Sequence, residues 1–220
     1  MWAAAVVLVL GGTAMLGYAG WEYYGTDVLS RRQHAELRDE LRARWAYPDV
    51  AAVLGPQAAV TSLGTADALV RIPRFGEDYE MPLIEGVRGE DLAAGIGHFP
   101  GTEPGQIGNV ALAANRVTNG EPFGDLSSLR PGDEVIVETE GATYTYVMDT
   151  EPDDLVVSFA DGWVLDPVPV PPAGQAPPGM PALSSAAAST ALITLTSCSE
   201  LFHSDERLVA FGHLVSTVAR

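Results

Sequence analysis

The sequence contains no lysine: its 12 basic residues are all arginines, and they face 29 aspartates and glutamates. The formal net charge is therefore −17 over 220 residues. A chain this acidic repels phosphate backbones, so we expect no nucleic acid among its partners. Cysteine is almost absent as well. The single Cys198 excludes an internal disulfide, and the fold must depend on packing alone.

Charge is missing from the whole stretch Trp2–Trp21. About twenty helical residues span roughly 30 Å, the thickness of the hydrocarbon core of a bilayer. The stretch ends in aromatic residues typical of a membrane–water interface, namely Tyr18, Trp21, Tyr23 and Tyr24. The pattern predicts a transmembrane anchor over residues 1–24. A cleaved signal peptide is the alternative, but it requires a basic leading region that this sequence does not show.

Residues 25–66 have a different texture. The segment Asp27–Trp45 interleaves opposite charges on neighbouring helical turns and has few apolar positions, which predicts a solvated helical stalk. A linker of Pro, Gly and small residues follows up to about Ala66. Arg31 and Arg32 lie beyond the apolar stretch, so the positive-inside rule by itself favours a cytoplasmic body.

Residues 67–220 read as one domain of short strands separated by Gly and Pro turns. Glu134–Thr139 and Thr143–Val147, joined by Glu140–Ala142, predict a β-hairpin. Further strands are expected at Leu69–Ile72, Asn109–Ala114, Leu155–Val157, Leu192–Cys198 and Arg207–Phe211. Many short strands with few helices predict an all-β fold, either a closed barrel or a sandwich.

The lone cysteine ends one of these strands. A thiol in this position is either a small core residue or a nucleophile. Arg207 follows nine residues later, and its guanidinium keeps its charge and donates several hydrogen bonds. Such a cation can stabilise a developing oxyanion, which favours the nucleophile.

Several blocks occur in an order that resembles the sortases, the cysteine transpeptidases of Gram-positive cell surfaces. The blocks are Leu69–Gly76, Gly97–Thr102, Pro104–Val110, Gly120–Phe123, Leu126, Leu129, Arg130–Asp133, Thr194–Cys198 and Arg207. Gly97–Thr102 resembles the His-Tyr-Pro-Gly-Thr block of class E in particular. The resemblance covers about residues 67–214.

This resemblance implies a closed sortase-type β-barrel with short helices, held outside the cell by a single-pass membrane anchor. It implies that Cys198 attacks the Thr–Gly bond of a sorting signal in a secreted surface protein and that Arg207 stabilises the oxyanion. The thioacyl intermediate would pass to an amine of a peptidoglycan precursor or a pilin, or to water in a thiol hydrolase. No cofactor or metal is implied.

One position departs from the family pattern. Where sortases carry Ala-Gly-His-Arg, this chain has Ala113-Ala114-Asn115-Arg116, so Asn115 occupies the place of the catalytic His. A second family His falls at Asn119. Imidazole can hold a charge beside a thiolate and return a proton to the leaving amine, whereas an Asn amide can only hydrogen-bond.

A histidine elsewhere could substitute for the missing one. His203 lies five residues beyond Cys198 and is the first choice, ahead of His98 and His213. Three hypotheses follow. The chain is a transpeptidase, slow or rescued; or a catalytically silent homologue that binds sorting signals or regulates an active sortase; or a structural protein of the envelope.

Overall fold

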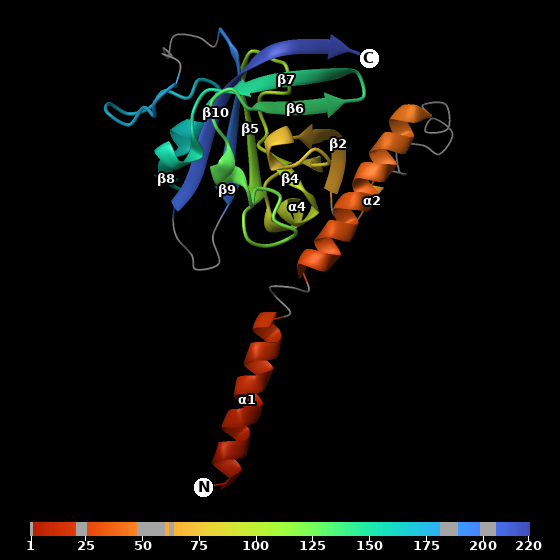
Figure 1. Ribbon diagram of the computed structural model, residues 1–220, viewed down its shortest axis with the longest axis vertical. Coiled ribbons are helices and arrows are strands. Elements are labelled where there is room, and N and C mark those ends of the chain that lie inside the picture. The colour runs from red at the N-terminus through yellow and green to blue at the C-terminus, as the bar shows by residue number, and fades with distance from the viewer. Residues whose placement is uncertain (1, 21–25, 48–59, 62–63, 181–188, 199–205) are drawn as a thin grey trace.

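The computed structural model describes residues 2–20, 26–47, 60–61, 64–180, 189–198 and 206–220 (Figure 1). Two helices, α1 (Trp2–Gly20) and α2 (Thr26–Ala46), precede a β-barrel. The strands are β1 (Val60–Thr61), β2 (Gly64–Arg71), β3 (Glu80–Glu85), β4 (Ile96–His98), β5 (Gly108–Asn115), β6 (Glu134–Thr139), β7 (Ala142–Met148), β8 (Val156–Ser158), β9 (Ala191–Cys198) and β10 (Glu206–Ala219). Short helices in the connections are α4 (Gly89–Ala94) and the 3₁₀ turns η3 (Pro73–Phe75), η4 (Leu126–Ser128), η5 (Pro152–Asp154) and η6 (Gly162–Leu165).

Eight strands close the barrel in the order β2-β3-β4-β5-β9-β10-β7-β6, and β6 pairs back to β2. The pairs β3–β4 and β5–β9 are parallel, and the other pairs of the ring are antiparallel. β1 pairs with β2, and β8 pairs with the first residues of β10. The prediction of a closed all-β barrel with short helices is therefore confirmed.

The barrel interior is filled by side chains from alternate residues of each strand. In β6, Val135 and Val137 are fully buried while Glu134 is exposed, as the period of two for a strand requires. Each fully buried Val, Leu or Ile contributes roughly 1.5–3 kcal/mol relative to exposure. The largest buried members of this core include Ile72, Ile96, Leu112, Phe123, Leu126, Leu129, Tyr146, Met148, Ile193 and Leu195.

The predicted hairpin is present: β6 ends at Thr139, β7 begins at Ala142, and Glu138 pairs with Thr143. The Thr139 hydroxyl donates to the Ala142 carbonyl and accepts from the Ala142 amide, which closes the two-residue turn. The expected strands also form, but β10 runs on to Ala219, well beyond the predicted end at Phe211.

Helix α1 forms inside the stretch predicted as an anchor. Among the described helices, none combines the length and the hydropathy needed to cross a membrane. The anchor over residues 1–24 thus stays a prediction. The predicted linker up to Ala66 falls mostly outside the described residues, and its last part is strand, in β1 and the start of β2.

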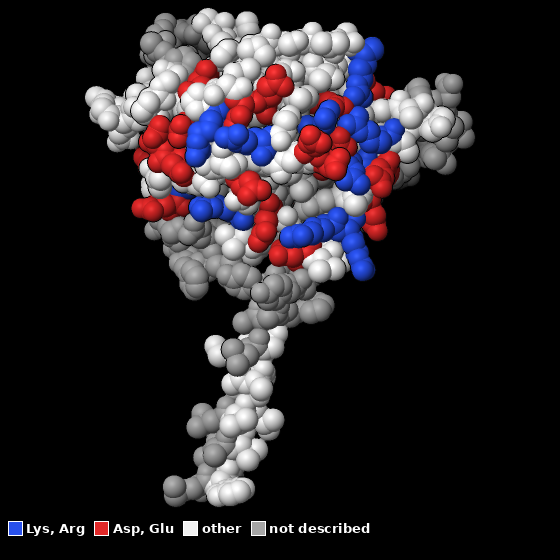
Figure 2. Space-filling view, viewed as in Figure 1, with Lys and Arg blue, Asp and Glu red and all other residues white. Residues whose placement is uncertain are grey.

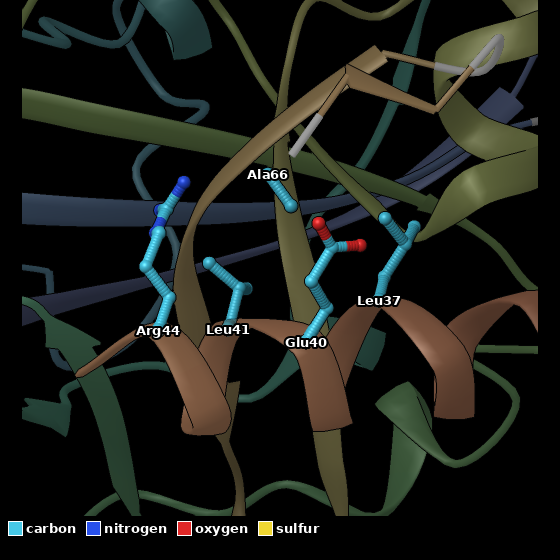
Figure 3. Close-up of a pocket in the computed structure, with 5 residues that line it drawn as sticks. All are labelled: Leu37, Glu40, Leu41, Arg44 and Ala66. Atoms are coloured by element: carbon cyan, nitrogen blue, oxygen red, sulfur yellow. The ribbon is translucent and has the colours of Figure 1, made fainter. Parts of the chain in front are cut away.

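Helix α2 corrects the prediction of a solvated stalk, because it packs along the barrel. Leu37 and Leu41, one helical turn apart, are 4% and 3% exposed and contact Leu69, Ile84 and other residues of the barrel wall. Figure 3 shows both leucines pointing from α2 toward Ala66 of β2. The helix is part of the folded body.

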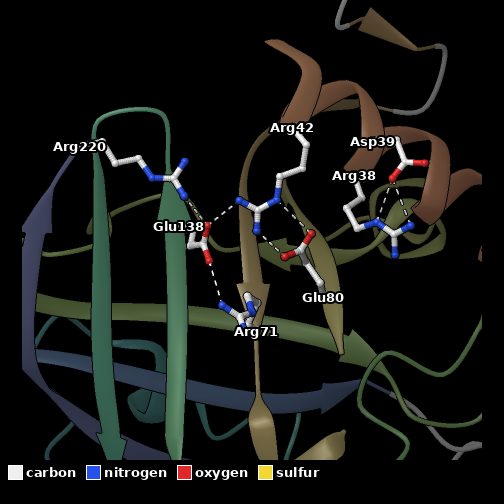
Figure 4. A network of polar contacts seen from close by, with 7 residues as sticks. All are labelled: Arg38, Asp39, Arg42, Arg71, Glu80, Glu138 and Arg220. Atoms are coloured by element: carbon white, nitrogen blue, oxygen red, sulfur yellow. Dashed lines mark hydrogen bonds and ion pairs between the residues drawn. The ribbon is translucent and has the colours of Figure 1, made fainter. Parts of the chain in front are cut away.

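An ion-pair network continues this contact (Figure 4). Arg42 of α2 reaches Glu80 of β3 and, at 2.7 Å, Glu138 of β6. Arg71 and Arg220 also pair with Glu138. Burial opposes ionisation of Glu138, but the hydrogen bonds and charges of these arginines outweigh it and lower its pKa below the usual value. A buried carboxylate of this kind is stable only with such partners.

Trp45 seals the far end of the same contact. Its ring lies under two guanidinium groups, with the carbon of Arg42 at 5.6 Å and that of Arg220 at 5.0 Å from the centroid. The end of α2 is thereby joined to the end of β10. On the face shown in Figure 2, arginines lie among acidic residues, so that opposite charges are neighbours on the surface.

We predict that Arg42→Gln lowers the free energy of unfolding by about 1–2 kcal/mol, because Glu80 and Glu138 each lose a partner while Glu138 keeps two others. Urea denaturation measures the effect. Arg38→Gln is the matched control, because Arg38 lies one turn earlier and pairs with Asp39 of its own helix.

The pH dependence gives this prediction a second arm. Because the pKa of Glu138 is lowered on folding, its stabilisation is present above about pH 4.3 and is lost as the pH falls through the lowered value. The deficit of Arg42→Gln should therefore shrink in acid. An equal effect of the two substitutions at every pH would contradict a role for the network.

Candidate active site

The candidate site lies where β5 and β9 end side by side. The two strands are parallel and in register from Gly108 with Ala191 to Asn115 with Cys198. Neighbouring strands lie about 4.8 Å apart, and parallel strands bring their carboxyl ends to the same edge. The position of the family His is therefore adjacent to the cysteine.

Arg207 enters from the other neighbour of β9. The pairing of β10 with β9 ends at Val209 with Thr196, so Arg207 and Cys198 each lie two residues beyond the last pair, at the same end of the two strands. On its other edge Arg207 pairs with Val157 of β8. Three residues distant in sequence, at 115, 198 and 207, thus lie on adjacent strands.

The Arg207 side chain is held in a defined place. It is 5% exposed, its guanidinium carbon lies 5.1 Å from the ring centroid of Phe159, and its Nη2 donates to the Asp161 carbonyl at 3.4 Å. A buried cation on an aromatic face with an oxygen acceptor has little freedom to rotate. Such a guanidinium is preorganised to stabilise negative charge.

Phe159 and the Asp161 carbonyl form a cradle for the Arg207 guanidinium, and a tight turn supports this cradle. The Asp161 carboxylate accepts from the Ser158 hydroxyl at 2.8 Å and from the Ser158 amide at 2.9 Å. The hydroxyl hydrogen bond first, then the amide bond and the charge of Arg207, lower the pKa of Asp161. The turn fixes Phe159 and the Asp161 carbonyl together, so sequence analysis that stopped at Arg207 missed two residues that orient it.

Buried polar side chains tie the next segment, η6, to the barrel. Asn109 of β5 donates from Nδ2 to the carbonyls of Val164 and Asp166, both at 3.1 Å. The Thr194 hydroxyl of β9 donates to the Asn109 amide oxygen at 2.8 Å. Asn109 and Thr194 are 3% and 0% exposed, so these bonds lie away from water. Polar residues inside apolar strand runs were the sequence signal for this contact.

Asn115 faces α4 on the other side of the site. The Asn115 side chain donates from Nδ2 to the Leu92 carbonyl at 3.2 Å. The backbone carbonyl of Asn115 accepts from the Phe123 amide at 3.0 Å. The side chain is therefore committed to a structural hydrogen bond. An amide held this way offers no proton that could be transferred.

The comparisons with known proteins agree with this geometry. The sortase domain model matches residues 70–215, two thirds of the chain, and includes positions 115, 198 and 207. The chain belongs to the sortase family. It is 29% identical over 220 residues to sortase SrtE1 of Streptomyces coelicolor, covering 95% of this chain but 55% of that protein. It thus spans about half the length of that curated relative, and 80% of the length of SrtE2 from the same organism, at 24% identity.

Solved structures point to the same class. Sortase E of Streptomyces avermitilis is 35% identical with a TM-score of 0.58, over 70% of this chain and 90% of that one. The SrtF sortase of Corynebacterium diphtheriae is 26% identical with a TM-score of 0.58, over 73% and 90% of the two chains. The fold is thus shared equally with both sortases, and the sequence identity is higher to the class E protein.

The histidines considered as substitutes divide into two groups. His203 lies outside the described residues. His98 is 3% exposed and bonds through Nδ1 to Glu85 at 2.7 Å and through Nε2 to the Thr102 carbonyl at 3.0 Å. His213 bonds to Asp149 at 2.9 Å. Both described histidines are thus engaged in local contacts of the sortase barrel.

The other predicted positions are also placed. Asn119, at the second family His, sits in a turn with a positive φ of 55° and donates to the Thr118 hydroxyl at 3.4 Å. Among the described residues no group of three or more His, Cys, Asp or Glu could hold a metal ion.

We predict that Thr194→Val destabilises the sortase domain by about 1–3 kcal/mol, because the buried Asn109 amide oxygen loses its donor. Guanidinium denaturation measures the change, with Thr217→Val on an exposed position of β10 as the control. Equal stability of the two variants would show that the contact between η6 and the barrel does not depend on this hydrogen bond.

Proposed function

We propose that this chain is a cysteine transpeptidase that cleaves the Thr–Gly bond of a sorting signal and joins the product to a cell-wall or pilin amine. One observation carries the proposal: within a sortase domain, the strand register pairs residue 115 with Cys198, and Arg207 lies on the strand next to that of Cys198. The structure of sortase E1 from Streptomyces coelicolor, 31% identical over 70% of this chain, contains a tripeptide in its active site. A peptide substrate is consistent with that relative.

The proposed reaction has two steps. The Cys198 thiolate attacks the threonine carbonyl, the C–N bond to glycine breaks, and a thioester to Cys198 forms. An incoming amine then attacks the thioester and releases the thiolate. In both steps negative charge develops on the carbonyl oxygen, where the Arg207 guanidinium donates hydrogen bonds.

The proposed reaction requires two proton transfers. The leaving amine requires a proton, and the thiol must lose one, but Asn115 supplies neither. Loss of general acid–base help costs about 10²–10⁴ in rate. A neighbouring imidazolium would also stabilise a thiolate, and the neutral amide of Asn115 carries no charge that could do so. We therefore expect a slow enzyme unless His203 supplies the missing group.

We predict that Asn115→His raises transpeptidation of a sorting-signal peptide by about 10- to 1,000-fold, because it restores an imidazole at the position in register with Cys198. Product formation is measured for the wild type, Asn115→His and Asn115→Gln, with Cys198→Ala as the blank. Gln is the matched control because it changes size without adding a titratable group.

The outcomes separate the hypotheses. No gain with Asn115→His, together with peptide binding and no thioacyl adduct in the wild type, would favour a silent homologue that binds sorting signals. Efficient wild-type turnover that is abolished by His203→Ala would instead show that His203 has replaced the missing histidine.

We also propose that α1 anchors the domain in the cell membrane, with the barrel on the extracellular side. The support for the anchor is the uncharged stretch Trp2–Trp21 and the exposure of apolar side chains on α1. The extracellular side is proposed from the resemblance to sortases, because Arg31 and Arg32 by themselves favour the opposite orientation. Val9, Leu10 and Met15 are 67%, 63% and 77% exposed, so the barrel does not cover them. Apolar surface of this kind needs another apolar environment.

We predict that the full-length chain stays in the membrane fraction after high-salt and carbonate washes, since the anchoring is apolar rather than ionic. Immunoblotting with a C-terminal tag measures the distribution. Recovery of the full-length chain in the soluble fraction would refute the anchor. Recovery of a shortened chain would support a cleaved signal peptide.

A further inference from the structure

The first half of α2 contacts the two segments that flank Asn115. Asp27 accepts a hydrogen bond from the Gly120 amide at 2.9 Å, in the turn that follows β5. His34, 4% exposed, bonds through Nε2 to the Ala93 carbonyl in the last turn of α4, at 3.1 Å. These contacts lie at the opposite end of the helix from the Arg42 network.

Both segments also hold Asn115. The Asn115 side chain donates to the carbonyl of Leu92, the residue before the partner of His34. On the other side, the chain leaves Asn115 and turns at once through residues 118–121. Any shift of α4 or of this turn therefore moves the position that lies beside Cys198.

The turn needs external support. Asn119, Gly120 and Glu121 have positive φ values of 55°, 77° and 55°, and two of them are not glycine. Such backbone is uncommon and persists where the surroundings over-determine it. A Cβ at Gly120 would lie 3.1 Å from Arg31 and 3.2 Å from His34, so α2 is packed directly against it. Arg31 also pairs with Glu121 at 3.8 Å.

We propose that the first half of α2 is a clamp that holds the turn 118–121 and the end of α4 around residue 115, with Asp27 and His34 as positioning residues for the sorting-signal site. The role at the peptide site rests on the function proposed above. The clamp itself is a property of the contacts and is testable without a substrate.

The clamp is sensitive to pH through His34. Desolvation by burial and then the charge of Arg31 lower the pKa of His34, and the bond to Ala93 offsets them only in part. Its Nδ1 is buried and has no hydrogen-bond partner among the described atoms, so a second proton would be unsatisfied. The docked helix therefore favours neutral His34.

The charged groups around this junction do not reverse that preference. They are Asp27 and Arg31 on α2, Glu121 on the turn, and Asp91 on α4, which is already paired with Arg88. As the pH falls below about 6.5, His34 takes up a proton when α2 is released from the barrel, whereas it stays neutral when α2 is packed against the barrel. Docking then weakens by up to tenfold for each pH unit, until the lowered pKa is reached.

Hydrogen exchange of the full chain in detergent tests the clamp. Asp27→Ala and His34→Ala should raise amide exchange in residues 92–95 and 115–124 by about three- to tenfold, the equilibrium value of one hydrogen bond. Asp27→Asn and His34→Gln keep an oxygen acceptor and an N–H donor, and should remain close to the wild type. Asp39→Ala, on the exposed face of the same helix, is the matched control.

Lowering the pH from 7.5 to 5.5 tests the role of His34 directly, because a residue that does not titrate would give no pH-dependent change in amide exchange. After correction for intrinsic rates, exchange in the two segments should rise in the wild type and stay flat in His34→Gln. Affinity for a sorting-signal peptide, measured with Cys198→Ala as the common background, should fall about three- to tenfold in the two alanine variants.

Several results would overturn the proposal. Exchange in both segments that matches Asp39→Ala would remove the clamp. Faster exchange with unchanged peptide affinity would remove its role at the site. If the parent protein binds no sorting-signal peptide, the proposed function fails, and the exchange result alone then decides the clamp.

Discussion

The site depends on one pairing, the parallel contact between β5 and β9. These strands are separated by the β6–β7 hairpin and the long connection through β8 and η6, yet they run in register over their whole lengths. A shift of one residue would turn every side chain to the opposite face of the sheet. Asn109 and Thr194 resist such a shift, because their hydrogen bond joins the two strands inside the core. The same bond pattern fixes η6, the segment next to the Phe159 and Asp161 cradle. The hydrogen bonds of Asn109 therefore connect the register of β5 and β9 to η6, which directly follows the segment that holds Arg207.

Helix α2 shows why charge composition alone did not predict its environment. From its sequence the helix is polar, with apolar positions too sparse for a wide buried stripe. Its burial comes from a narrow contact through Leu37 and Leu41, together with ion pairs to partners 38 and 96 residues away, Glu80 and Glu138. Arginine suits this role, because its planar group binds two carboxylates and also stacks on Trp45. A charged helix can thus pack against a barrel when the barrel surface supplies the counter-charges.

The sequence predicted those parts of the fold whose signals are local. The β6–β7 hairpin has alternating β-branched residues and a short turn, and β9 is an unbroken run of strand-forming residues. It did not predict β3, β4 or α4. β3 contains Pro82, β4 has three residues and α4 has six, so none carries a periodic pattern long enough to read. The length of β10 was missed because its exposed end, Ser216–Ala219, is held by pairing with β7 rather than by burial.

The candidate site divides along the same line. Cys198, Arg207 and position 115 were recognised from motif order, and the strand register brings those positions together. What orients them was not visible, since the Asp161 carbonyl and the Leu92 carbonyl are backbone groups that carry no sequence signature. Asn115 illustrates the consequence. An amide at this position satisfies the Leu92 carbonyl with a neutral donor, whereas an imidazole would add a titratable group beside the thiol. Under the proposed function, Arg207 with Phe159 and Asp161 supplies the charge-stabilising part of the site, while Asn115 puts a hydrogen bond to the Leu92 carbonyl in the place of a proton-transfer group.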